Sequence, residues 1–138
     1  MKNFAQAKGQ GEWAEVCFLW RASALGFTVS RPFGDNARYD FVVDAGAGLL
    51  RVQVKSVSVA HRADYRIPAS SGGRKKKAYT PGQIDFLAAY IIPEDAWYII
   101  PYKVLAPYNK RRAFSLHTTE SKVRNSLDKY RERWDLFE

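Results

Sequence analysis

Three polar side chains near the middle of the sequence have the types and spacing that phosphodiester hydrolysis requires. Asp40 precedes the apolar run 41–43, and Gln53 and Lys55 are separated by one residue in the next apolar segment. Carboxylate and amide oxygens are ligands for hard divalent cations. A lysine offsets phosphate charge or orients the attacking water. Residues of this kind on neighbouring strands indicate a metal-dependent phosphodiesterase.

A β-hairpin is expected to bring these side chains together. Segments 39–44 and 49–57 are strand-like, and the turn between them contains Gly46 and Gly48. Successive side chains of a strand point to opposite faces, so Gln53 and Lys55 share one face of the second strand. The sequence therefore predicts that Asp40 lies close to these two residues.

A helix is predicted over residues 10–25, ended by Gly26. The apolar stripe expected along it consists of Trp13, Cys17, Trp20 and Ala24. Glu15 lies in largely apolar surroundings, where a carboxylate costs free energy unless it pairs with a cation. Glu12 competes with Glu15 as a site residue, but is interpreted as a charge that favours the helix N-terminus.

The remaining segments predict one α/β domain over residues 1–138, with a mixed sheet covered by helices. Strands are expected at 27–31, 62–67, 84–92, 97–100 and 113–116, with a helical turn at 101–105. The continuous apolar run 84–92 is typical of a strand buried on both faces. A second long helix is predicted over 120–134 from the apolar spacing of Val123, Leu127, Tyr130 and Trp134.

Asp40, Gln53 and Lys55 together resemble the signature of the PD-(D/E)XK nuclease superfamily. Tyr39 replaces the signature proline, and Gln53 replaces the second acid. The resemblance is good over residues 8–57 and extends to Tyr102. It implies a restriction-endonuclease-like core, in which a central mixed β-sheet is flanked by helices.

Two branches of that superfamily resemble different parts of the chain. The segment 8–15 is similar to the opening helix of archaeal Holliday-junction resolvases, whose helix glutamate corresponds to Glu15 by its spacing from Gly11 and Gly26. The Gln-x-Lys form, with Tyr79 and Asp85 downstream, looks more like group I intron homing endonucleases. Tyr79 and Asp85 are therefore candidates for shaping the site.

The resemblance implies an endonuclease that hydrolyses double-stranded DNA with Mg²⁺ or Mn²⁺. Its catalytic residues would be Glu15, Asp40, Gln53 and Lys55, and the first three would hold the metal with the backbone carbonyl of Val54. It also implies a homo-oligomer, a dimer or tetramer, because one unit carries one site for one strand. Two other interpretations stay open: a nuclease for branched DNA, and an inactive DNA-binding relative in which Gln53 is the trace of a lost acid.

The charge balance favours a polyanionic partner. Lys and Arg total 22 against 14 Asp and Glu, which gives a net charge of +8. This charge attracts nucleic acid without regard to its sequence. The run Arg74, Lys75, Lys76 and Lys77 follows two glycines and is expected to contact the DNA backbone, although an ordinary solvated loop has the same composition.

Other classes of protein are disfavoured by the same sequence. No apolar run is long enough for a membrane span, and no signal-peptide core follows Met1. The single cysteine, Cys17, excludes an internal disulfide framework, suits the cytoplasm and is expected to be a buried helix thiol. His61 and His117 lack partners at zinc-ligand spacing, so zinc is disfavoured.

Overall fold

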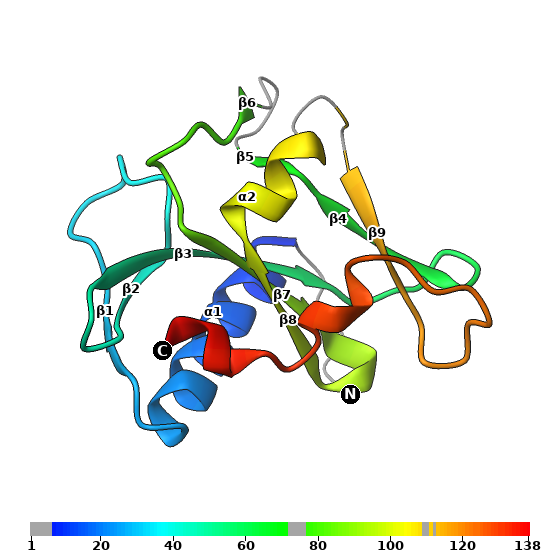
Figure 1. The fold of residues 1–138 in the computed structure, drawn as a ribbon, viewed down its shortest axis with the longest axis horizontal. Coiled ribbons are helices and arrows are strands. Elements are labelled where there is room, and N and C mark those ends of the chain that lie inside the picture. Colours follow the sequence, from blue (N-terminus) through cyan, green and yellow to red (C-terminus); the bar gives the residue numbers. More distant parts are fainter. Residues whose placement is uncertain (1–6, 72–76, 109–110, 112) are drawn as a thin grey trace.

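The computed structural model describes residues 7–71, 77–108, 111 and 113–138. A five-stranded mixed sheet in the order β1-β2-β3-β7-β8 lies at its centre (Figure 1). Its strands are β1 (Thr28–Ser30), β2 (Phe41–Asp44), β3 (Leu49–Val57), β7 (Phe86–Ile91) and β8 (Ala96–Pro101). Strands β3 and β7 are parallel, and the other neighbours are antiparallel. The expected mixed sheet is therefore present.

The hairpin of β2 and β3 has a ladder that stops partway along the longer strand. The β2–β3 register runs from Asp44 opposite Leu49 to Phe41 opposite Val52. Beyond Val52, β3 continues in parallel pairing with β7, where Gln53 lies opposite Leu87. The two strands thus separate at Asp40, which precedes β2, and at Gln53, which follows Val52 in β3.

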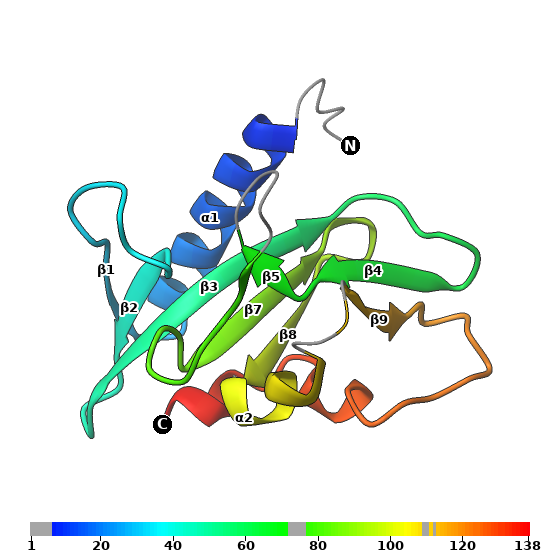
Figure 2. The same cartoon turned by 90° about the horizontal axis from the view of Figure 1, so that it is seen from above.

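Helix α1 (Ala7–Ala24) covers one face of the sheet (Figure 2). Its buried residues are Ala14, Phe18 and Ala22, and the ring of Phe18 stacks on that of Phe41 at 5.3 Å. The predicted apolar stripe was wrong at Trp20, which is 67% exposed, and at the exposed Ala24, whereas Trp13 and Cys17 pack against the core and Cys17 is only half-buried. The small Ala14 and Ala22 let the helix approach the sheet closely on either side of the Phe18 ring. Bulkier residues such as Trp20 do not fit in this narrow contact and face outward.

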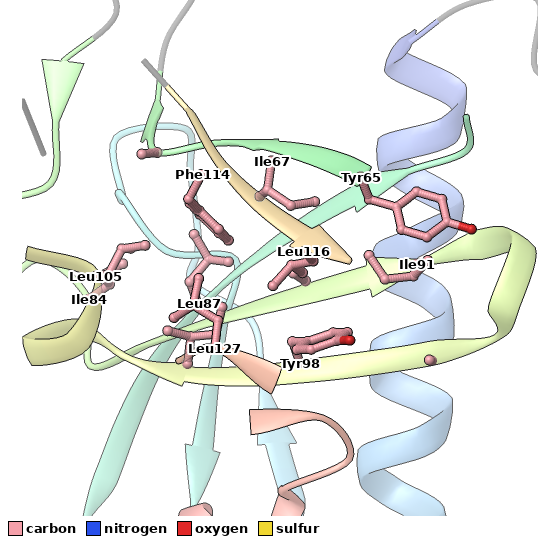
Figure 3. Close-up of a cluster of buried hydrophobic side chains, with 14 of the residues drawn as sticks. Tyr65, Ile67, Ile84, Leu87, Ile91, Tyr98, Leu105, Phe114, Leu116 and Leu127 are labelled. Carbon is pink, nitrogen blue, oxygen red and sulfur yellow. The ribbon is translucent and has the colours of Figure 1, made fainter. Parts of the chain in front are cut away.

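The opposite face of the sheet packs against the segments that follow β3. Strands β4 (Asp64–Pro68) and β9 (Ala113–His117) form a two-stranded sheet, and helix α2 (Tyr102–Leu105) lies beside it. Figure 3 shows Ile67, Leu116 and Leu87 meeting in the core between these layers. Strands β5 (Ser70–Ser71) and β6 (Lys77–Ala78) pair antiparallel, and β6 begins with Lys77, the last residue of the basic run. Strand β7 is buried on both faces, as predicted.

The C-terminal segment differs from the long helix predicted over 120–134. It contains only short 3₁₀ turns at Asp128–Tyr130 and Trp134–Phe137. The Asn125 amide accepts the N–H of Leu127 and donates to the carbonyl of Ser115, while the Asp128 carboxylate accepts the N–H of Asn125. Such side chains offer the backbone a substitute for helical hydrogen bonds. Apolar spacing alone therefore gave a wrong prediction.

Within the described ranges, no helix is both long and apolar enough to cross a membrane.

Candidate active site

Asp40 lies at the point where β2 and β3 part. Its N–H donates to the carbonyl of Val52 at 2.9 Å, and its Oδ2 accepts the N–H of Val54 at 2.8 Å. The carboxylate thus satisfies a β3 donor located beyond the last β2–β3 residue pair. A carboxylate has about four acceptor positions, so this bond orients Asp40 and leaves capacity for a cation.

Glu15 projects from α1 toward the same region. Its side chain is 23% exposed and forms an ion pair with Arg31. Burial raises the pKa of the Glu15 carboxyl, and the nearby charge of Asp40 raises it further. The carboxyl groups of a helix residue and a strand residue are therefore within electrostatic reach of each other.

Lys55 and Gln53 are half-buried on β3, opposite Ala89 and Leu87 of β7. Burial raises the pKa of Asp40, whereas the Val54 hydrogen bond and the charge of Lys55 act in the other direction. The Gln53 amide lies 3.4 Å from the Val54 carbonyl oxygen. The fold therefore gathers Glu15, Asp40 and Lys55, with the Gln53 side chain next to the Val54 carbonyl.

These groups fit a hard divalent cation. Two half-buried carboxylates that repel each other gain free energy from a shared positive charge. Amide and backbone carbonyl oxygens add neutral ligands, as Mg²⁺ and Mn²⁺ accept. Across the described residues, no cluster of three His, Cys, Asp or Glu side chains gathers for a metal. The donor set would thus combine Glu15 and Asp40 with uncharged oxygens.

An open groove of about 660 Å³ has Glu15 in its wall and reaches Phe41, the residue after Asp40. It runs between α1 and the first strands, and its wall includes Lys8, Gly11, Glu15, Arg31 and Phe41. The cations Lys8 and Arg31 share this wall with the acids Glu12 and Glu15 and with apolar side chains, so its charge is balanced until a cation binds Glu15.

Asp85 supports the sheet at the start of β7. Its carboxylate accepts hydrogen bonds from the backbone N–H of Arg51 at 2.7 Å and from the Arg51 guanidinium at 3.0 Å, twice. Burial opposes ionisation, but these bonds and the charge of Arg51 lower the pKa of Asp85. Asp85 thus connects the start of β7 to β3 at Arg51, which is two positions before Gln53.

Tyr79 is buried under Arg38. The Arg38 guanidinium lies 5.2 Å from the centre of the Tyr79 ring and donates to the Lys77 carbonyl at 3.2 Å. Because Arg38 is two residues from Asp40, this contact connects the segment before the acid to β6. Of the four basic residues predicted to bind DNA, Lys77 is exposed, whereas residues 74–76 lie outside the described residues.

Two arginines of this region were missed by sequence reasoning. Arg31 pairs with Glu15, and Arg51 pairs with Asp85. Arg51 had one usable signal, its position two residues before Gln53 on the same strand face. Arg31 is one of many cations in a basic chain, and only the fold shows its acidic partner.

The Arg51–Asp85 pair gives a stability prediction. Asp85→Ala should lower the free energy of unfolding by about 1.5–3 kcal/mol, because it removes charge-assisted hydrogen bonds from a half-buried arginine. Since the folded pKa of Asp85 is below its unfolded value near ~3.9, this contribution is present above that pH and disappears as acid titrates the folded carboxyl. Urea unfolding at neutral and acidic pH measures both effects. Asp35→Ala, at an exposed turn, should change stability little.

The site thus combines a helix glutamate, an aspartate that directly precedes β2 and a lysine of β3 on a mixed sheet. A family model described as PD-(D/E)XK endonuclease matches residues 5–137. The chain belongs to the PD-(D/E)XK endonuclease family. This confirms the predicted relationship and the endonuclease class of its function.

A solved structure supports the same assignment. The structure of a bacterial homing endonuclease, I-Ssp6803I, matches with a TM-score of 0.83 and 29% sequence identity. The match covers 96% of this chain and 93% of that chain, which confirms the restriction-endonuclease-like fold. The comparison with curated proteins gave no match.

Proposed function

We propose that the chain is a divalent-metal-dependent endonuclease that hydrolyses double-stranded DNA in the manner of a homing endonuclease. The observation that carries the proposal is the meeting of Glu15, Asp40 and Lys55 where β2 and β3 part. The family supplies the reaction class. The similarity to a bacterial homing endonuclease favours this interpretation over a branched-DNA nuclease or an inactive relative.

In the proposed mechanism, Glu15, Asp40 and the Gln53 carbonyl would hold Mg²⁺ or Mn²⁺. When bound, such an ion polarises the scissile phosphate and lowers the pKa of a coordinated water. Lys55 directs its ammonium toward the attacking water and the phosphate. Its charge offsets the negative charge that builds up as the phosphodiester bond breaks. The Val54 N–H holds Asp40 in position throughout, which preorganises the site.

Duplex cleavage requires two sites of this kind. We treat residues 1–138 as one domain with one site, so cutting both strands calls for two copies related by symmetry. The net charge of +8 would draw each copy to the duplex. The proposed partners are therefore double-stranded DNA and further copies of the same chain.

A substrate comparison tests the proposed specificity. The protein should cut linear duplex in Mg²⁺ and show no preference for a four-way junction of the same sequence. Asp40→Asn, purified in parallel, controls for contaminating nucleases. A marked preference for the junction would instead identify a branched-DNA nuclease. Absence of cleavage with retained DNA binding would identify an inactive relative.

Gln53 should set the metal requirement. A neutral amide holds Mg²⁺ more weakly than a carboxylate, so Gln53→Glu should bind the ion at least as well as the parent. Gln53→Ala should need more Mg²⁺ for half-maximal rate because one ligand is lost. Initial rates across a Mg²⁺ series measure both variants. An unchanged Mg²⁺ dependence in Gln53→Ala would show that the side chain does not face the ion.

The basic run should contribute sequence-independent affinity. Replacing residues 74–77 by alanine should weaken binding to every duplex alike, because contacts to phosphates carry no base information. The log–log slope of affinity against salt should flatten by about 0.9 for each lost contact. Binding isotherms at several salt concentrations measure this slope.

The matched control removes four exposed cations elsewhere: Lys103, Lys122, Lys129 and Arg133. This variant has the same net charge as the loop variant. A general effect of charge would flatten both slopes equally and would contradict a specific role for residues 74–77.

A further inference from the structure

Arg31 follows β1 and lies beside Glu15, one of the two acids of the proposed metal site. Its guanidinium forms an ion pair with Glu15 and lies 5.3 Å from the centre of the Phe41 ring, next to Asp40 in sequence. Its side chain is 62% exposed, although both partners are much less so. Arg31 thus reaches from solvent to both elements that carry the acids.

The charge of Arg31 acts on both proposed metal ligands. Burial raises the pKa of Glu15 and of Asp40, and the positive charge of Arg31 opposes the rise in each case. A divalent cation held by these two carboxylates would repel the guanidinium. Arg31 and the metal therefore compete for the same negative charge.

We propose that Arg31 is a resident counter-ion that pairs with Glu15 when metal is absent and moves to a DNA phosphate when metal is bound. The inference rests on the proposed function, because it assumes that the two acids hold a cation. A guanidinium can pair with either the Glu15 carboxylate or a DNA phosphate, since its donors match carboxylate and phosphate oxygens.

Because Arg31 is exposed, breaking its ion pair with Glu15 costs little free energy. Exposed ion pairs stabilise proteins by only about 0.2–1 kcal/mol, so a divalent cation readily displaces the guanidinium. The same side chain lines the open groove whose wall also contains Glu15 and Lys8, and a DNA strand bound there would bring a phosphate within reach of Arg31. Released from Glu15, Arg31 has a long, flexible side chain with which to follow that strand.

The first test measures DNA affinity against salt with and without metal. EDTA gives the metal-free state, and Ca²⁺ serves as the probe cation, with intact DNA verified after each titration. Arg31→Ala should match the parent slope in EDTA, because Arg31 is then held by Glu15. In Ca²⁺ its slope should be shallower by about 0.9, the value of one phosphate contact.

The control for this test is Arg133→Ala, which removes an equal charge from another exposed arginine–carboxylate pair. Its slopes should parallel those of the parent in both conditions. If Arg31→Ala flattened the slope equally in EDTA and Ca²⁺, Arg31 would be a permanent phosphate contact. If it flattened neither, Arg31 would be only a structural partner of Glu15. Either result overturns the proposal.

The second test releases Arg31 without metal. In EDTA, Glu15→Gln should bind DNA with a slope about 0.9 steeper than the parent, because the freed guanidinium gains a phosphate. Adding Arg31→Ala to Glu15→Gln should remove that gain, which a double-mutant cycle isolates from the loss of the acid itself. A gain that persists in the double variant would contradict the inference.

Calorimetry without DNA gives a third readout. Arg31→Ala should bind Ca²⁺ about 1.5- to 5-fold more tightly than the parent, which is the value of a lost competing ion pair. Unchanged or weaker Ca²⁺ affinity would overturn the competition.

The same measurements separate this inference from the proposed function. If the parent binds Ca²⁺ and cleaves DNA in Mg²⁺ while Arg31→Ala behaves like the parent, only the role of Arg31 fails. If the parent binds no divalent cation, the proposed function fails and the counter-ion role fails with it.

Discussion

Asp40→Asn should abolish DNA cleavage while leaving DNA affinity unchanged or higher. The substitution removes one of two carboxylates proposed to hold the metal, and with it a negative charge near the phosphate. The amide oxygen can still accept the Val54 N–H that Asp40 accepts at 2.8 Å, so the local structure should be retained. Cleavage of a labelled duplex and its binding in Ca²⁺ provide the two measurements.

Asp44→Asn is the matched control for Asp40→Asn. Asp44 is at the other end of β2, is exposed, and bonds to the N–H of Gly46 in the hairpin turn. Its replacement removes the same charge from the same strand and should leave the cleavage rate near that of the parent. Full activity in Asp40→Asn would exclude Asp40 from the site. Equal loss in both variants would indicate a general effect of charge on this strand.

Lys55→Ala should lower the single-turnover cleavage rate by about 10²-fold or more, with a much smaller change in DNA affinity. A charge aimed at the scissile phosphate stabilises the transition state more than the bound substrate, so its loss reduces the rate selectively. Single-turnover rates and binding isotherms separate the two effects.

Lys122→Ala, at an exposed position in the C-terminal segment, removes the same charge and should change the rate little. Lys55→Arg adds a further check, because it keeps the charge but changes the donor geometry. If Lys55→Ala lowered rate and affinity by the same small factor, Lys55 would be an ordinary backbone contact.

The hairpin and its polar residues were predictable because strand signals there are local. Alternation along 49–57 determines which side chains share a face, and the turn between the strands fixes their pairing. The sequence does not show where the ladder stops. The ladder with β2 ends at Val52, where the parallel pairing of β7 along the other edge of β3 begins, a contact between residues more than thirty positions apart.

Helical periodicity was less informative than strand alternation. In α1 the expected stripe was wrong in its second half, because close approach to the sheet favours the small Ala14 and Ala22 over the bulky Trp20. In the C-terminal segment, Asn125 and Asp128 bond to the backbone and prevent the regular helix that the apolar spacing predicts.

The residues of the candidate site that belong to a sequence motif were predictable. Those that lie outside the motif were predicted only in part. Asp40 and Lys55 follow from the hairpin, and Glu15 follows from the resemblance to archaeal resolvases, by its spacing from Gly11 and Gly26. Arg31 does not, because its position depends on how α1 packs over β1. Asp85 was expected to shape the site, and its hydrogen bonds to Arg51 indicate a supporting contact between β3 and β7.

Cleavage of supercoiled plasmid tests whether Glu15 and Asp40 hold a metal that is used to hydrolyse DNA. The parent protein is incubated with Mg²⁺, with EDTA, and with EDTA followed by excess Mg²⁺, beside Glu15→Gln and Asp40→Asn. The account predicts nicked and linear DNA from the parent only when free Mg²⁺ is present, and intact plasmid from both variants. Cleavage in EDTA, or parent-like cleavage by either variant, would contradict it.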